Sequence, residues 1–243
     1  MSHVVAVIPA RGGSKGISSK NLADFCGKPL VVWTIEQALA ARRIDSVWVS
    51  SDDDAILDVS TRAGARTIRR PAEISGDEAT SESCWLHALD VIETDGPVID
   101  VLVAPQCTSP VREPHDFDDA VALFEREGYD SLFSATSVPD FNIWRPNTSG
   151  ELESFTYDYR NRGRRQAKRP QFLENGSFWV LKPSVLREQG NRLGGRIGVY
   201  PMAFWKSFQI DEPEDLRLCA SMMREYLPGE TISASGGPTR DEA

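Results

Sequence analysis

This sequence of 243 residues has few of the features that mark membrane, secreted or zinc-binding proteins. No apolar run approaches the roughly 20 residues that a membrane-spanning helix needs, and the amino terminus lacks the charged segment and apolar core of a secretory signal. Cysteine is scarce. Cys26, Cys84, Cys107 and Cys219 are widely separated and form no CxxC pair, which favours reduced, mostly buried thiols over a zinc site. We therefore expect a cytoplasmic protein that does not enter a membrane.

The chain also lacks an excess of positive charge, because 36 acidic side chains and 27 lysines and arginines give a formal net charge of −9. Affinity for nucleic acid comes chiefly from neutralising phosphates, so nonspecific nucleic-acid binding is not expected. The cations gather instead at residues 11–20 and 160–169. The second cluster has the composition of a nucleic-acid or nuclear-localisation patch, but the acidic chain around it favours a multiply charged small ligand.

Neither the Walker loop nor the dinucleotide-binding fingerprint is present, yet a glycine-rich loop follows the first predicted strand. The apolar run at residues 4–8 is typical of a strand buried on both faces, and Pro9 ends it. Glycines and the cations Arg11, Lys15 and Lys20 come next. Glycine lets backbone N–H groups face an anion, and open α/β sheets bind ligands at the carboxyl ends of their strands. The loop therefore predicts a phosphate site.

Strand and helix patterns then alternate, which predicts a mixed α/β sheet with helices on both faces. The strands are expected at residues 4–8, 45–50, 65–69, 100–104 and 130–136, and the helices at 31–41, from 54, and at 82–93, 116–127 and 213–226. Proline, glycine and aromatic residues at 137–171 predict an insertion with short strands. We expect one domain over residues 1–228, followed by a disordered tail rich in small residues at 229–243.

The opening loop resembles that of a known family. Residues 8–17 read IPARGGSKGI and are followed by Lys20 and Asn21, which matches the motif I-P-A-R-G-G-S-K-G-I-x-x-K-N. That motif opens the cytidylyltransferases that activate sialic acids and related 2-keto-3-deoxy sugar acids. Further similar segments are R-P at 70–71, the polar loop to Ser81, QCTSPVR at 106–112, RRQ at 164–166, ENGSFW at 174–179 and ID at 210–211. The resemblance implies a Rossmann-like three-layer nucleotidyltransferase sheet with an inserted dimerisation arm.

The resemblance also implies which residues form the site. The nucleotide-binding set is Ala10, Arg11, Gly12, Gly13, Ser14, Asn21, Arg70, Ala79, Ser81 and Gln106, and the sugar-acid set is Gln106, Arg165, Gln166 and Asn175. A glutamine amide donates and accepts at once, which suits a pyrimidine edge or a ribose. Arginine grips a planar carboxylate through two parallel hydrogen bonds, so Arg165 is expected to hold the acid. A loop with ordinary turns is the alternative for these segments.

Asp211 stands where the family has its metal-binding aspartate, so the resemblance implies Mg²⁺ (or Mn²⁺) at this residue. Many members have a second aspartate where this chain has Gln209. Magnesium commonly uses one or two carboxylates plus substrate phosphates, so one aspartate suffices; helix capping without metal is the alternative. The triplet at residues 52–54 is likewise a metal candidate, but a helix N-terminus explains it better.

The catalytic set that the resemblance implies is Arg11, Lys15, Lys20 and Asp211, whose charges would offset the charge that grows on departing pyrophosphate. The hypothesis is transfer of CMP from CTP to the anomeric hydroxyl of a nonulosonic, sialic-acid-like sugar acid. No residue stands out as the general base. The inserted arm contacts a second subunit in this family, which implies a homodimer.

Three alternatives stay open. Enzymes for the eight-carbon octulosonic acid usually open with S-x-R-x-x-x-K, which this loop does not follow. A non-catalytic nucleotide-binding paralogue is supported by Gln209 and by Ala167, where the family has aspartate. A general uridylyl- or guanylyltransferase would show G-x-G-[ST]-R, which is absent. Cys107, in place of a family proline, loosens its turn but leaves the polar groups. The sequence does not identify the sugar acid.

Overall fold

One mixed sheet forms the centre of the computed structural model of this chain, which describes residues 2–13, 16–138, 141–164 and 171–227. Its strands are β1 Val4–Pro9, β4 Ser46–Ser51, β5 Arg66–Arg69, β6 Val101–Pro105, β7 Ser131–Val138, β10 Gln171–Leu181 and β11 Ile197–Met202. Their order is β11-β7-β10-β6-β1-β4-β5. Only β10 runs antiparallel to its neighbours in this sheet. Because β6, β1 and β4 are parallel, their carboxyl ends meet at one edge.

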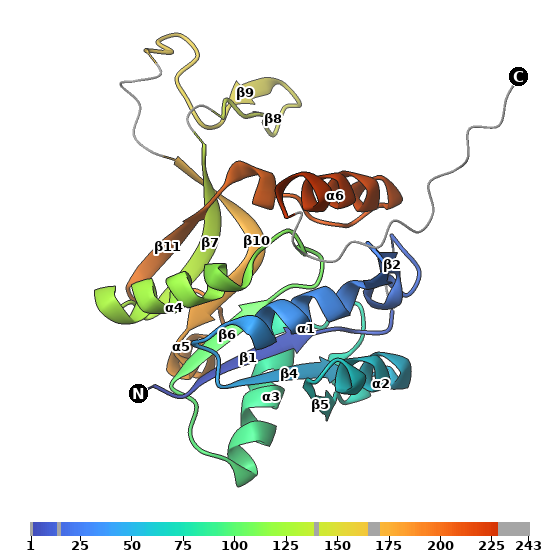
Figure 1. Ribbon diagram of the computed structural model, residues 1–243. Helices are drawn as coiled ribbons and strands as arrows, with labels where there is room; N and C mark the ends of the chain where they lie inside the picture. The colour runs from blue at the N-terminus through green and yellow to red at the C-terminus, as the bar shows by residue number, and fades with distance from the viewer. Residues whose placement is uncertain (1, 14–15, 139–140, 165–170, 228–243) are drawn as a thin grey trace, which may run out of the picture.

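Helices cover both faces of the sheet (Figure 1). They are α1 Leu30–Ala40, α2 Asp54–Arg62, α3 Ser81–Asp95, α4 Pro114–Glu127, α5 Pro183–Gln189 and α6 Pro213–Tyr226. Successive side chains of a strand point to opposite faces, so Ala6 and Ile8 of β1 pack with α1, α2 and α4, while Val5 and Val7 pack with α3 and α5. The predicted three-layer α/β fold is confirmed. α6 packs against α1 in a third cluster that contains Trp33 and Met223.

Short elements complete the chain. They are the strands β2 Asp24–Phe25, β3 Lys28–Pro29, β8 Trp144–Pro146 and β9 Leu152–Ser154, and the 3-10 helices Lys20–Leu22, Ala72–Ile74 and Phe204–Lys206. The 3-10 helix Lys20–Leu22 follows the glycine-rich loop directly. Among the helices of the described residues, none combines the length and the apolar character needed to cross a bilayer.

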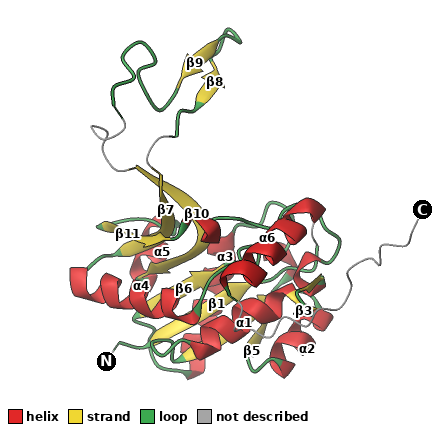
Figure 2. Ribbon diagram, turned by 45° about the horizontal axis from the view of Figure 1, so that its top comes forward, coloured by secondary structure: helices red, strands yellow, loops and turns green. Residues whose placement is uncertain are grey.

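Residues 141–164 form an arm that projects beyond the sheet from the ends of β7 and β10 (Figures 1 and 2). The arm contains the antiparallel pair β8 and β9, which are the short strands expected in this insertion. The Trp144 ring lies 6.0 Å from that of Tyr157 and 5.1 Å from that of Tyr159, measured between centroids. Leu152 and Phe155 keep 69% and 56% of their surface exposed. The arm is therefore held together by aromatic contacts and presents apolar side chains to solvent.

The predicted helices and strands are found within a few residues of their expected bounds, but β10, α5 and β11 were not predicted. The ENG segment indicates a turn, whereas in the structure the chain continues as β10 through a bulge. The pairing of β10 with β7 shifts register between Glu174 and Trp179. Gly176 lies in this bulge with φ +64°, a left-handed conformation that favours glycine. A glycine with positive φ occurs both in turns and in bulges, and here the pairing of β10 with β7 makes it a bulge.

Candidate functional site

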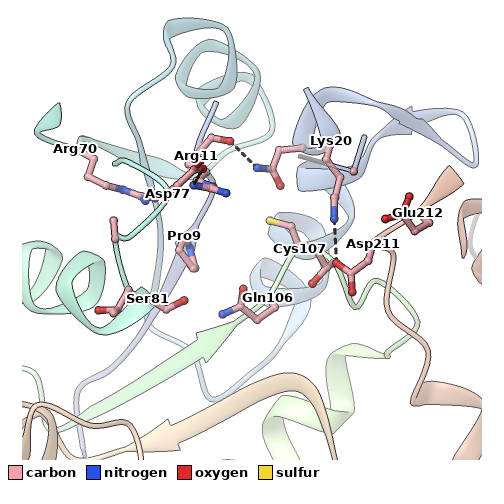
Figure 3. A pocket seen from close by; sticks show the side chains of 15 residues that line it. Pro9, Arg11, Lys20, Arg70, Asp77, Ser81, Gln106, Cys107, Asp211 and Glu212 are labelled. Atoms are coloured by element: carbon pink, nitrogen blue, oxygen red, sulfur yellow. Dashed lines mark hydrogen bonds and ion pairs between the residues drawn. The ribbon is translucent and has the colours of Figure 1, made fainter. Parts of the chain in front are cut away.

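A pocket of about 490 Å³ lies at the carboxyl edge of β1 and β6, beside the start of α3. It is lined by Pro9, Arg11, Gly16, Lys20, Asn21, Arg70, Asp77, Ala79, Thr80, Ser81, Gln106, Cys107, Thr108, Asp211 and Glu212. Figure 3 shows Arg11 and Asp77 on one side of it, Lys20 and Asp211 on the other, and Gln106 at the end of its strand between them. Segments far apart in sequence therefore contribute to one site.

The structure brings most of the predicted site residues together in this pocket. Arg11, Lys20, Asn21, Arg70, Ala79, Ser81, Gln106 and Asp211 line it. Ala10, Gly12, Gly13 and Asn175 are described but do not line it; Ala10 is buried in the core. Ser14, Lys15, Arg165 and Gln166 lie outside the described residues, as does Ala167. Their roles stay predictions.

The first turn of the glycine-rich loop is held by the aspartates at the start of α2. The Gly12 N–H donates to Asp52 Oδ1 at 3.0 Å, and a Cβ atom on Gly12 would lie 2.8 Å from Asp53 Oδ2. Asp53 caps α2 by accepting from the N–H groups of Ala55 and Ile56 at 2.7 and 3.2 Å. These carboxylates therefore fix a loop and cap a helix, as the capping interpretation predicts.

The other end of the loop rests on the segment before α6. A Cβ atom on Gly16 would collide with the Asp211 carbonyl oxygen, so only glycine permits this approach. Lys20 Nζ donates to the Ile210 carbonyl oxygen at 2.9 Å and to Asp211 Oδ1 at 3.0 Å. Asn21 Nδ2 donates to the Arg11 carbonyl oxygen at 2.9 Å, which closes the loop on itself. Lys20 is thus held at the pocket by the backbone that precedes α6.

Two arginines reach the pocket in different ways. Arg11 is partly exposed and donates to Asp77 Oδ1 at 2.9 Å and to the Gly76 carbonyl oxygen at 3.2 Å. Arg70 is buried, and its guanidinium donates to Ser50 Oγ at 3.2 Å and to the Ser50 carbonyl oxygen at 2.5 Å. Arg70 is therefore a rigid cation in the wall, whereas Arg11 is held by a carboxylate that lines the same pocket.

The carboxylates at and before the start of α6 have different roles. Asp215 accepts from the N–H groups of Asp211 and Glu212 at 2.9 and 2.8 Å, and these backbone hydrogen bonds lower the pKa of Asp215. Glu212 and Asp215 form the capping box of α6. The Asp211 carboxylate takes no part in this cap; it is 70% exposed and faces Lys20. Capping and ligand binding are therefore compatible in this segment.

The side chains of Gln209 and Asn175 both contact the bulge of β10. The Gln209 amide packs over Gly176, where a Cβ atom would lie 2.7 Å from Nε2. Asn175 is buried, and its Oδ1 accepts from Ser134 Oγ at 2.6 Å and from the Ser177 N–H at 3.1 Å. Asn175 thus does not line the pocket that Gln106 lines, because its amide ties β10 to β7.

Several pocket residues were not predicted as site residues. Asp77 and Thr80 belong to the same polar loop as Ala79, so its motif could have pointed to them. Cys107 and Thr108 follow Gln106, and Glu212 follows Asp211. Burial raises the pKa of the Cys107 thiol to about 12, so this cysteine is a neutral wall rather than a nucleophile at neutral pH. All four cysteines are free, and Cys84, Cys107 and Cys219 are buried.

Comparison with known proteins shows that the chain is similar to cytidylyltransferases that act on sugar acids. The chain is 35% identical over 212 residues to N-acylneuraminate cytidylyltransferase A of Danio rerio, which covers 86% of this chain and 48% of that protein. It is 34% identical over 133 residues to pseudaminic acid cytidylyltransferase of Campylobacter jejuni strain 81-176, which covers 54% of this chain and 57% of that protein. The chain spans about half the length of the curated relatives it matches.

Solved structures show the same fold at lower identity. CMP:2-keto-3-deoxy-manno-octonic acid synthetase complexed with CTP superposes with a TM-score of 0.67 and 17% identity, covering 92% of this chain and 99% of that one. A family model described as "Cytidylyltransferase" matches residues 5–218, which include the whole central sheet apart from Val4. The chain therefore belongs to the cytidylyltransferase family.

Proposed function

We propose that this chain transfers CMP from CTP to the anomeric hydroxyl of a nonulosonic acid and releases pyrophosphate. The observation that carries the proposal is the pocket itself, where Arg11, Lys20 and Asp211 converge with Gln106 at the carboxyl edge of the sheet. Its volume of about 490 Å³ is in the range of small-ligand sites. The relatives named above for N-acylneuraminate and pseudaminic acid favour a sugar acid of this kind.

The cations supply what a triphosphate needs. Arg11 and Lys20 enter the pocket from the two ends of the glycine-rich loop. Hydrogen bonds with Asp52, Asn21 and the Ile210 carbonyl oxygen hold these ends. Attack on the α-phosphorus breaks its bond to the bridging oxygen, so negative charge grows on pyrophosphate as it leaves. Cations held in place before the reaction stabilise that charge without reorganisation. We assign this task to Arg11 and Lys20, with Lys15 as a further predicted contributor.

The residues present fit a single divalent cation. Asp211 offers an exposed carboxylate on the pocket wall, and hard oxygen ligands suit Mg²⁺ or Mn²⁺. Gln209 packs over Gly176, and the Glu212 carboxylate serves the capping box of α6. We therefore propose that Asp211 holds the ion, which would polarise the α-phosphoryl group and neutralise developing charge when bound.

The sugar-acid side and the assembly state are further parts of the proposal. Gln106 stands at the pocket floor, where its amide can meet the nucleotide and the acid. Arg165 and Gln166 are proposed to bind the acid on the strength of their motif. We also propose a homodimer that forms through the arm, because the arm leaves Leu152 and Phe155 exposed and an interface would bury such apolar side chains.

Pyrophosphate release tests the function directly. The assay combines the chain with magnesium, each of the four nucleoside triphosphates, and a panel of nonulosonic and octulosonic acids. We expect release that requires both CTP and one nonulosonic acid. Release with an octulosonic acid alone would favour the eight-carbon alternative. Calorimetric CTP binding without turnover on any acid would favour the non-catalytic binder.

The ion pair between Arg11 and Asp77 leads to a prediction about nucleotide affinity. Asp77 holds Nη1 of Arg11 and its side chain is 55% exposed, and we expect a triphosphate that binds this nitrogen to displace the Asp77 carboxylate. Exposed pairs of this kind contribute up to about 1 kcal/mol, so Asp77→Asn is expected to tighten CTP binding about two- to fivefold. Calorimetry of CTP binding measures this change.

Glu78→Gln is the matched control for Asp77→Asn. Glu78 is the next residue of the same loop, is exposed and does not line the pocket. The Glu78→Gln substitution removes one negative charge from nearly the same place but breaks no ion pair with Arg11. The difference between the two variants therefore measures the effect of the Arg11–Asp77 ion pair alone. Equal tightening in both variants, or weaker binding in Asp77→Asn, would contradict the displacement of Asp77.

A further inference from the structure

Arg112 is a fully buried arginine behind the pocket floor, five residues after Cys107 in the chain. Its guanidinium donates hydrogen bonds to α1, to the turn at Gln106 and to the bulge of β10. The acceptors are Gln37 Oε1 at 3.0 Å, Thr34 Oγ1 at 2.7 Å, the Gln106 carbonyl oxygen at 3.0 Å, and the carbonyl oxygen and Oγ of Ser177 at 2.8 and 3.1 Å. One side chain therefore joins three elements that do not follow one another in sequence.

These hydrogen bonds fix the backbone of Gln106 from both sides. The Gln106 carbonyl oxygen accepts from Arg112 Nη2, and the Gln106 N–H donates to the Ser177 carbonyl oxygen at 3.0 Å. That same oxygen of Ser177 accepts from Arg112 Nη1. Gln37 in turn holds the Arg112 segment, because its Nε2 donates to the carbonyl oxygens of Pro110 and Arg112 at 2.8 and 2.9 Å. Gln106 thus stands at the pocket on a closed ring of hydrogen bonds.

The charge of Arg112 has no anionic hydrogen-bond acceptor among the described residues. All the acceptors named above are neutral oxygens, although buried charges are normally paired. The carboxylate that acts on Arg112 through space is Asp116. Lys206 Nζ binds Asp116 at 2.7 and 2.9 Å and also pairs with Glu113 at 2.8 Å, so Asp116 is shared between the two cations. Burial lowers the pKa of Arg112 to about 10, so the side chain stays charged at neutral pH. A buried positive charge therefore lies close to the floor of the pocket.

We propose that Arg112 is a positioning residue for Gln106 and that its buried charge attracts the polyanionic part of the nucleotide. The inference rests on the proposed binding of CTP. Water is excluded around the guanidinium, so its field is screened less than that of a surface lysine. The guanidinium makes its hydrogen bonds to neutral oxygens on the side of Gln106, so a negative ligand at the pocket would add negative charge on that side. The attraction must then grow with the charge of the ligand, which a purely structural role does not predict.

The experiment compares the affinities of CTP, CDP and CMP for the wild-type chain, Arg112→Met and Arg112→Lys by calorimetry. Arg112→Met removes the charge, and we expect it to weaken CTP binding about tenfold more than CMP binding, the size of effect that a nearby unit charge has at an effective dielectric constant near 20. Arg112→Lys keeps the charge and should retain the wild-type ratio of CTP to CMP affinity. Equal loss for all three nucleotides in Arg112→Met would overturn the electrostatic role.

A second variant covers the case in which Arg112→Met does not fold. Gln37→Glu places a carboxylate against Arg112 Nε, which should reduce the ratio of CTP to CMP affinity in the same direction. It also loses the two hydrogen bonds from Gln37 Nε2, and that loss should weaken all three nucleotides alike. An unchanged ratio in a folded Gln37→Glu variant would contradict the proposal. Leu186→Ala, which opens the buried core under α5 far from Gln37 in sequence, controls for lost stability and should keep the ratio. A wild-type chain that binds no cytidine nucleotide would overturn the proposed function itself.

Discussion

Lys20→Met is expected to lower kcat for pyrophosphate release about 10²- to 10³-fold, the cost of losing one prearranged charge stabiliser in an active site. The Lys20 side chain is 12% exposed, and Nζ is fixed by the Ile210 carbonyl oxygen and by Asp211. Methionine keeps much of the length of lysine but loses the charge. Because the charge on pyrophosphate develops during bond breaking, kcat should fall more than CTP affinity. Steady-state kinetics and calorimetry on the same variant measure both quantities.

Lys182→Met is the matched control for this change. Lys182 lies between β10 and α5 and pairs with Asp130 at 2.7 Å, and it does not line the candidate site. The control loses the same charge and one ion pair and should keep kcat within about twofold of wild type, as surface ion pairs contribute little. A Lys20→Met variant with the kcat of this control would remove Lys20 from the mechanism.

The strands of the sheet centre were predictable from sequence because burial on both faces requires a continuous apolar run. β1 and β6 are such runs, and nearly all their residues are buried. The helices that cover them repeat apolar residues at a spacing that the sequence displays directly. β10 was not predicted because its path depends on a distant partner. Gly176 supplies the same conformation in a turn as in a bulge, and only pairing with β7 makes it a bulge.

The candidate site was predictable where a motif names the residue and its strand end fixes the place. Arg11 and Gln106 follow strands that end at this edge, and Asp211 precedes the start of α6; all three line the pocket. The direction of a side chain was not predictable, because it depends on neighbours in space that the sequence does not reveal. Asn175 turns to Ser134 rather than to the pocket. Arg112 closes the QCTSPVR motif yet lies fully buried behind the floor.

Asp211→Asn is expected to weaken the binding of the catalytic magnesium ion and so to lower magnesium-dependent turnover. The substitution keeps the shape of the side chain but removes its charge. Loss of a partner that merely supports a metal ligand already costs about 10- to 100-fold in metal affinity, so loss of the proposed ligand should raise the magnesium concentration at half-maximal rate at least tenfold. Metal-free CTP binding should be unchanged or tighter, because Lys20 loses its ion pair with Asp211 and the pocket loses a negative charge.

Asp211→Asn removes both the proposed metal ligand and the ion-pair partner of Lys20. Calorimetry of CTP binding with and without magnesium separates these two effects and does not depend on turnover. Wild type should bind CTP more tightly when magnesium is present, and the variant should lose that gain. Glu214→Gln removes a neighbouring carboxylate on α6 whose side chain is 76% exposed and should leave the gain intact. If Asp211→Asn keeps both the gain and the rate, the metal is held elsewhere. The exposed Asp211 carboxylate would then act only as the partner that orients Lys20.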